Sequence, residues 1–142
     1  MNDKLNALLA NLTVEYHKLQ NMHWLVKGAD FFQAHAQLEA LYDALLPSID
    51  EVAETILQLG GTPVASLRNV LATATIAERP ATALTSTEAF KLVRDDFQAL
   101  LDQVKDAKRA ADAEENYLVS AQMDGHIASL TKTIWMLRAQ AA

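Results

Sequence analysis

The sequence predicts an all-α protein, a four-helix bundle with one long crossover that carries a short extra helix. Apolar residues recur at alternating spacings of three and four along four long blocks, which is the period of helices that bury one face. The connections between the blocks are short, then long at roughly two dozen residues, then short again. With 142 residues, of which 51% are apolar, the chain is expected to form one domain over residues 1–142.

The first helix is expected from about Asn2 to Lys27. Asn2 or Asp3 can accept the capping hydrogen bond at its start, and Gly28 ends it. Its apolar stripe consists of Leu5, Leu8, Leu12, Tyr16, Leu19, His23 and Val26.

The second helix is expected from about Phe31 to Leu59, where two glycines and a proline end it. Pro47 lies inside this helix and removes one backbone donor, so we expect a bend there. The apolar stripe of the helix consists of Leu38, Leu41, Leu45, Ile49, Val52, Ile56 and Leu59.

The long crossover runs from Gly60 to about Leu84 and contains one short amphipathic piece, Ala65 to Leu71, while little in the sequence favours strands. The third helix opens with a capping box, Thr85 to Glu88, and an acidic break over residues 112–116 separates it from the fourth. This short–long–short connectivity is the ferritin-like arrangement. The apolar stripes are Phe90, Val93, Phe97, Leu100, Val104 and Ala107 in the third helix, and Met123, Ile127, Leu130, Ile134 and Leu137 in the fourth.

The composition narrows the class of function. The chain has no cysteine, which excludes a disulfide scaffold, thiolate zinc sites and thiol nucleophiles. Its net charge of −6 favours a cation as partner over a nucleic acid. No segment reaches the ~20 consecutive apolar residues of a membrane span, and the first residues lack the apolar run of a signal peptide, so a soluble cytoplasmic protein is expected.

The second helix carries a polar face apart from its apolar stripe. His35, Glu39, Asp50 and Glu54 fall within about 100° of one another around the helix axis. His35 and Asp50 are too far apart to share a metal ion, because fifteen positions of an α-helix span about 22 Å. A two-fold axis near the middle of the helix would lay it antiparallel against its copy. His35 and Glu39 of one chain would then face Asp50 and Glu54 of a partner chain. His23, on the first helix, could complete each site.

Two imidazoles and three carboxylates suit Fe²⁺ or another divalent first-row metal better than calcium or magnesium. The chain contains no Glu-x-x-His motif, which argues against a di-iron site within one bundle of this fold. Each residue also has an ordinary explanation: His23 as a hydrogen-bonded core histidine, the two i,i+4 pairs as solvated surface, and Trp24 and Trp135 as core or interface aromatics. The spacing alone does not name the metal.

Two motifs closely resemble signatures of the Dps family, the ferritin-like mini-ferritins of bacteria. The first is His23 to Gly28 followed by His35-x-x-x-Glu39, and the second is Ile49 to Glu54 running on to Pro63. The resemblance spans the whole chain and includes Phe31-Phe32, Leu41-Tyr42 and Lys132 to Leu137.

The resemblance implies a hollow dodecameric shell with ferroxidase centres between two-fold-related subunits. There Fe²⁺ is oxidised, typically by hydrogen peroxide, and stored as ferric mineral without release of hydroxyl radical. By resemblance, Trp24 is the tryptophan beside the centre that can take up oxidising equivalents. The di-iron ligands are implied to be His23, His35 and Glu39 of one chain with Asp50 and Glu54 of its partner.

The chain departs from the family pattern at three positions. Glu39 stands where many members have Asp, which keeps the carboxylate but lengthens its arm. Ala34 replaces the usual Leu or Val, which is expected to change packing only. Thr55 replaces the Arg that usually follows the second motif, so a fixed cation beside the site is missing.

Two further features bear on partners. Family members that bind DNA often use lysine-rich tails, but the amino-terminal stretch offers only Lys4, and the basic residues 105, 108 and 109 form only a small cluster, so we expect little DNA affinity. The acidic residues Asp112, Glu114 and Glu115 either line an iron-entry pore or form a solvated turn. The competing functions are a protein that mainly compacts nucleoid DNA and a ferritin-like shell with impaired ferroxidase activity.

Overall fold

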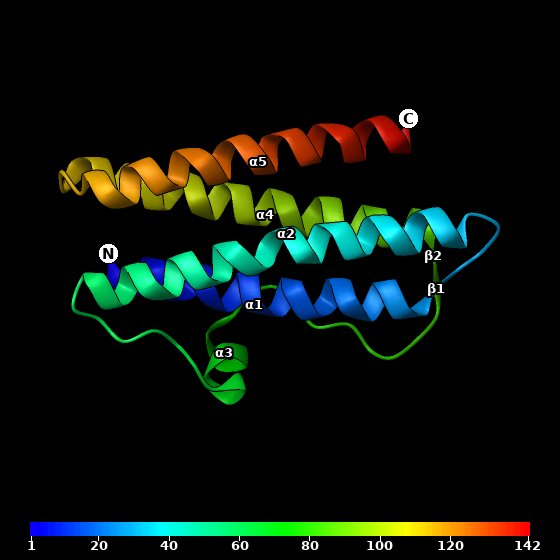
Figure 1. Ribbon diagram of the computed structural model, residues 1–142, viewed down its shortest axis with the longest axis horizontal. Helices are drawn as coiled ribbons and strands as arrows, with labels where there is room; N and C mark the ends of the chain where they lie inside the picture. Colours follow the sequence, from blue (N-terminus) through cyan, green and yellow to red (C-terminus); the bar gives the residue numbers. More distant parts are fainter.

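The computed structural model describes residues 1–142 and contains two antiparallel helical hairpins joined by a long crossover (Figure 1). This confirms the ferritin-like four-helix bundle with a short extra helix in its crossover. Helices α1 and α2 form the first hairpin and α4 and α5 the second, and α3 in the crossover lies against α1. The elements are α1 (Asn2–Leu25), β1 (Val26–Lys27), α2 (Phe31–Gln58), α3 (Leu67–Thr73), β2 (Leu84–Thr85), α4 (Ser86–Ala113) and α5 (Tyr117–Ala141).

The two ends of α1 differ from the prediction. Met1 is the N-cap residue and no side chain caps the helix; the side chain of Asn2 lies instead against Gly61, where it leaves no room for a Cβ. The helix ends at Leu25, because β1 leaves it to pair in parallel with β2, Val26 opposite Leu84. This short ladder joins the turn between α1 and α2 to the start of α4, and it is not predicted from the sequence.

The start of α4 is the predicted one. The Thr85 hydroxyl oxygen accepts a hydrogen bond from the backbone N–H of Glu88 (3.2 Å), and the Glu88 carboxylate accepts one from the backbone N–H of Thr85 (2.9 Å). This reciprocal pair is the capping box. It fixes where α4 begins, directly after β2.

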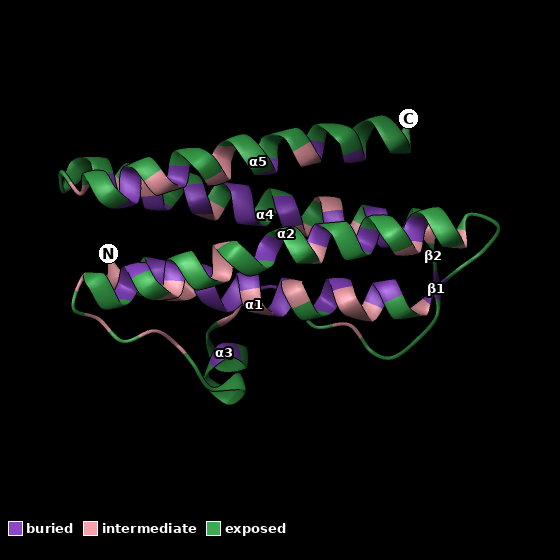
Figure 2. Cartoon of the chain, in the orientation of Figure 1, coloured by how far each residue is buried: buried purple, intermediate pink, exposed green.

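The predicted apolar stripes meet in one core of 32 buried apolar side chains, which Figure 2 shows as the inward faces of the long helices. Four predicted stripe residues, Tyr16, Ile49, Leu59 and Ile127, are only half-buried. None of the helices is both long and apolar enough to cross a membrane.

Three polar clusters tie the elements together inside or beside this core. Between α1 and the crossover, the buried Asn11 amide oxygen accepts hydrogen bonds from the backbone N–H groups of Thr75 (2.8 Å) and Ile76 (3.0 Å). Between α1 and α4, the ammonium of Lys18 lies 2.7 Å from the Asp96 carboxylate, and both side chains are largely buried. Between α2 and α5, His126 Nε2 lies 3.0 Å from the Glu51 carboxylate.

Candidate metal centre

His23 and His35 hold each other in place where α1 turns into α2. His23 Nδ1 donates to the backbone carbonyl of His35 (2.7 Å), and His35 Nδ1 donates to the backbone carbonyl of His23 (2.8 Å). The two rings stack with centroids 3.6 Å apart and an interplanar angle of 15°. His23 is buried and His35 half-buried, so the hydrogen bonds and the stacking hold both imidazole rings in place at this end of the hairpin.

The direction of these hydrogen bonds fixes the tautomers. A carbonyl oxygen can only accept, so the proton of each neutral imidazole resides on Nδ1 and the lone pair on Nε2 stays available. A backbone carbonyl in this position is the usual orienting partner of a metal-binding histidine. The pair therefore fits a divalent first-row metal as a source of two nitrogen ligands.

Glu39 adds a carboxylate one turn after His35. It is exposed, and its Oε1 accepts a hydrogen bond from the hydroxyl of Tyr42 (3.3 Å). The Tyr42 ring also meets the ring of His23 edge-on, with centroids 5.4 Å apart. Burial of the phenol and the nearby negative charges of Glu39 and Asp43 raise the pKa of Tyr42.

Tyr42 is not among the site residues predicted from the sequence, where Leu41-Tyr42 is only part of the family resemblance. The available signal was its position three residues after Glu39, a spacing that brings two side chains together on a helix surface.

Asp50 and Glu54, the remaining predicted ligands, are exposed in the second half of α2. The helix is continuous between them and the histidine pair, so Asp50 lies about 22 Å from His35 along the axis and Glu54 about one turn farther. No three His, Asp or Glu side chains of one chain come together in an arrangement that would hold a metal ion. One chain thus presents a histidine half with Glu39 and, separately, a carboxylate half.

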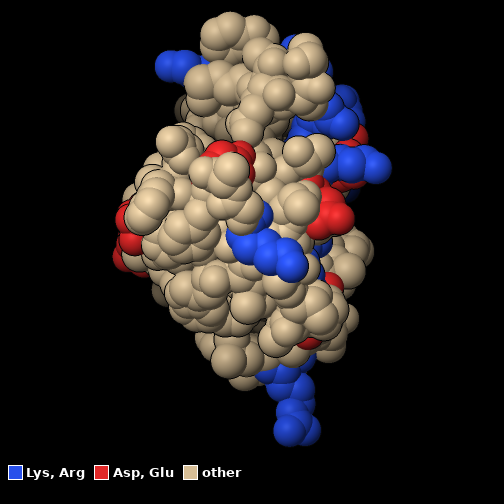
Figure 3. Space-filling model, turned by 90° about the vertical axis from the view of Figure 1, so that its right-hand side faces the viewer, with Lys and Arg blue, Asp and Glu red and all other residues tan.

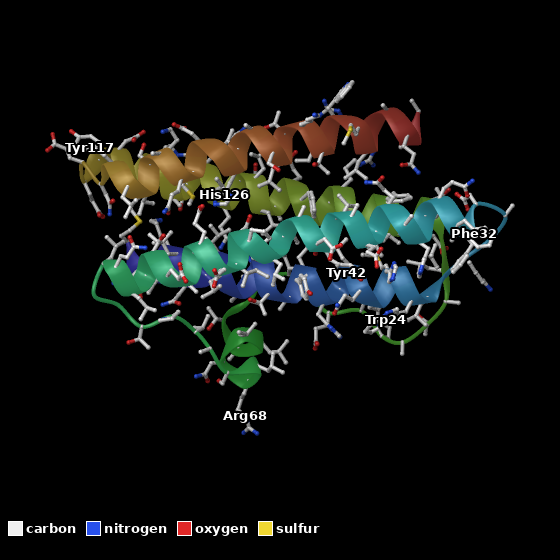
Figure 4. The ribbon with its side chains drawn as sticks, in the orientation of Figure 1. Trp24, Phe32, Tyr42, Arg68, Tyr117 and His126 are labelled. Carbon is white, nitrogen blue, oxygen red and sulfur yellow. The ribbon has the colours of Figure 1, made fainter.

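Trp24 lies next to His23 in the sequence but faces outward. Its side chain is 61% exposed and its ring meets that of His17 edge-on, with centroids 6.1 Å apart (Figure 4). Large apolar side chains are also exposed on α2, α3 and α5. Exposed apolar side chains are common at interaction surfaces, so those of α1, α2 and α3 are candidates for subunit contacts. On these three helices they are Trp24, Phe32, Leu46, Leu57, Leu67 and Leu71.

Two of the departures from the family pattern have clear structural consequences. Ala34 is buried at the start of α2, as expected for a packing position. Thr55 is buried too, and its hydroxyl donates either to the backbone carbonyl of Glu51 (2.8 Å) or to the side-chain oxygen of Gln122 on α5 (2.9 Å). A neutral tie between α2 and α5 thus stands where the family usually has an Arg.

Comparison with known proteins identifies the family. The sequence profile of the ferritin-like domain matches residues 2–142. A DNA protection during starvation protein of Helicobacter pylori is 33% identical over 97% of this chain and 96% of its own length. The protein of the same name from Brevibacillus brevis is 37% identical over 95% of this chain and 90% of its own length. The chain belongs to the Dps family.

A solved Dps structure agrees with this. Dps from Vibrio cholerae O1, a member of a broad superfamily of ferritin-like diiron-carboxylate proteins, matches with a TM-score of 0.96 at 34% identity, covering 99% of this chain and 88% of that one. The Dps family is associated in general with iron storage and protection from oxidative damage, and with iron as the bound metal. The family resemblance seen in the sequence motifs is confirmed.

Some of the charged residues considered for DNA binding and iron entry already form ion pairs or hydrogen bonds with other residues of the same chain. The Lys4 ammonium lies 2.7 Å from Asp106, and that of Lys108 lies 2.9 Å from Asp124. In the acidic break, the Asp112 carboxylate accepts a hydrogen bond from the Ser120 hydroxyl (2.5 Å), which ties the end of α4 to the start of α5. The other two acidic residues of the break are exposed.

Proposed function

We propose that this Dps-family chain forms a homo-oligomeric shell, a dodecamer, that oxidises Fe²⁺ at di-iron centres shared between two-fold-related subunits and stores the ferric product. His23, His35 and Glu39 of one subunit and Asp50 and Glu54 of its partner would bind the two ions. The observation that carries the proposal is the reciprocal hydrogen bonding of the two histidines. It leaves both Nε2 lone pairs available on one chain, while the carboxylates needed to complete the set lie at the other end of α2.

Two Fe²⁺ substrate ions side by side allow clean reduction of hydrogen peroxide. Each Fe²⁺ gives one electron, the O–O bond breaks, and two hydroxide ions form together with two Fe³⁺, so no hydroxyl radical leaves the centre. The two imidazoles bind the ferrous ions, and the three carboxylates stabilise the ferric product. Trp24, adjacent in sequence to His23, would supply the second electron from its indole when only one Fe²⁺ is bound.

Stopped-flow oxidation tests this proposal. Fe²⁺ is added anaerobically to the assembled protein, limiting peroxide follows, and ferric absorbance is recorded for wild type and for the His23→Ala/His35→Ala double variant. The matched control is His126→Ala, which removes a histidine from α5. Fast oxidation with soluble iron in wild type and control, lost in the double variant, is expected. Equal rates in all three proteins would refute the proposal, and replacing peroxide by dioxygen tests the oxidant preference.

We further propose that the chain binds DNA weakly, although curated relatives carry DNA protection in their names. The ion pairs of Lys4 and Lys108 support this, because a lysine that already has a carboxylate partner contributes little to phosphate binding. On the face drawn in Figure 3, Lys and Arg lie in separate groups among Asp and Glu. Gel shifts with supercoiled DNA at low and moderate salt test this; retention at both would refute it.

We propose that the exposed carboxylates of Glu114 and Glu115 attract Fe²⁺ at the point of iron entry. Asp112 has a mainly structural role, because its carboxylate already accepts a hydrogen bond from Ser120. Neutralising the two glutamates to Gln should slow iron uptake at low salt, where attraction of cations is least screened. Unchanged uptake would leave the acidic break as a solvated turn.

A further inference from the structure

We propose that Tyr42 is a positioning residue that holds the carboxylate of Glu39 at the metal centre. The inference rests on the proposed function, because it assumes that Glu39 binds a metal ion together with His23 and His35. It concerns a residue that touches both kinds of ligand on this chain: a carboxylate through its hydroxyl and an imidazole through its ring.

The ring of Tyr42 is well placed to act as a fixed support. It belongs to α2, and it meets two rings of α1 edge-on, that of His23 at 5.4 Å and that of Tyr16 at 5.6 Å between centroids. Figure 4 labels it where α1 and α2 run side by side. These two edge-on contacts restrict the orientation of the Tyr42 ring and therefore of its hydroxyl.

Glu39 is the ligand that most needs such a support. Its side chain is exposed and has one more rotatable bond than the Asp that many family members have at this position. A free glutamate on a helix surface occupies several rotamers, and fixing one of them on metal binding costs entropy. The hydrogen bond from Tyr42 selects one rotamer in advance, and it uses only Oε1, which leaves Oε2 for the ion.

The hydrogen bond from Tyr42 requires the longer side chain of a glutamate at position 39. An Asp at position 39 would withdraw the carboxylate by about one carbon–carbon bond, ~1.5 Å, from a hydroxyl that is already 3.3 Å away. The bond would then be lost. Tyr42 and Glu39 are therefore expected to act as a pair, and the pair explains how the chain accommodates its longer carboxylate.

A double-mutant cycle on metal affinity tests the pair. Co²⁺ serves as a probe that peroxide-free buffer leaves unoxidised, and calorimetry on the assembled shell gives its affinity for wild type, Tyr42→Phe, Glu39→Asp and the double variant. Tyr42→Phe should weaken Co²⁺ binding roughly three- to tenfold, the effect of one net hydrogen bond. In the Glu39→Asp background the same change should have less than a twofold effect.

The controls separate the possible failures. Tyr16→Phe removes the neighbouring phenol hydroxyl and should leave Co²⁺ affinity unchanged, and thermal unfolding of Tyr42→Phe reports any general loss of packing. Equal losses from Tyr42→Phe in both backgrounds, or an equal loss from Tyr16→Phe, would overturn the positioning role while the metal centre stands. Equal Co²⁺ binding by wild type and His23→Ala/His35→Ala would instead overturn the proposed function itself.

Discussion

The buried charges between α1 and α4 give the sharpest test of what stabilises this bundle. The carboxylate of Asp96 is the partner of the Lys18 ammonium at 2.7 Å, and the two side chains are only 16% and 7% exposed. Glu15 is fully buried in the same cluster, and its carboxyl, when protonated, can donate a hydrogen bond to Asp96. Burial, and next the neighbouring Asp96, raise the pKa of Glu15 well above its ordinary value. Asp96 is therefore the anion that neutralises Lys18.

Removing Asp96 should be costly only when no other anion can replace it. In the single variant Asp96→Asn, Glu15 can ionise and become the new partner of Lys18. The decisive perturbation is Asp96→Asn in a Glu15→Gln background, which leaves the Lys18 ammonium buried without a partner. Breaking a buried pair in this way costs about 3–5 kcal/mol. For a chain of this size that corresponds to a fall in unfolding temperature of roughly 10 °C or more.

Differential scanning calorimetry on assembled protein at neutral pH measures the difference between Glu15→Gln and Glu15→Gln/Asp96→Asn. Asp95→Asn in the same background is the control, because Asp95 is adjacent but exposed. A fall no larger for Asp96→Asn than for Asp95→Asn would refute the reasoning. It would mean that water reaches the Lys18 ammonium once Asp96 is gone.

Three further predictions concern single side chains. The raised pKa of Glu15 means that the neutral carboxyl stabilises the fold below pH 4.5 and that this contribution is lost as pH rises through the folded-state value. In thermal unfolding from pH 5 to pH 8, the stability of Glu15→Gln relative to wild type should therefore increase as the pH rises. A difference in unfolding temperature that stays constant with pH would contradict this. Asn11→Ala should leave the backbone N–H groups of Thr75 and Ile76 unpaired, each costing about 1–3 kcal/mol unless water reaches it. Amide hydrogen exchange at Thr75 should then become faster. Unchanged exchange would mean that Asn11 does not hold the crossover against α1. Thr85→Ala should lower the free energy of unfolding by ~1 kcal/mol, because the helix cap is lost. Urea unfolding measures this, and the control Thr87→Ala should show no change.

Much of the fold follows from local patterns in the sequence. Helical spacing of apolar residues gives the four long helices and their core faces, and the Thr85 capping box fixes the start of α4 within one residue. The β1–β2 ladder escapes such reasoning, because two-residue strands from distant segments leave no periodic signal. Glu15 and Lys18 escape it too, since charged residues at core-facing positions are ordinarily taken as solvated.

For the site, the sequence gives positions but not orientations. Helical angles and rise predict that His35 with Glu39 and Asp50 with Glu54 form two separated groups, and the structure has them on one continuous helix. The tautomers of the two histidines depend on backbone carbonyls brought together by the α1–α2 turn, which no spacing rule reveals. The contact of Tyr42 with His23 likewise requires the packed hairpin.

If the metal centre is shared between subunits, two inactive variants should restore activity when they assemble together. His23→Ala/His35→Ala retains the carboxylate half of the centre, and Asp50→Ala/Glu54→Ala retains the histidine half. In a mixed dimer one of the two centres is complete and the other has neither half. With random pairing of equal amounts, about one quarter of the wild-type number of centres should form. Co-expression with two different tags, isolation of shells carrying both, and peroxide-driven oxidation of Fe²⁺ measure this fraction. Both variants alone are the controls. Mixed shells as inactive as the parents would refute the shared arrangement, whatever the iron chemistry.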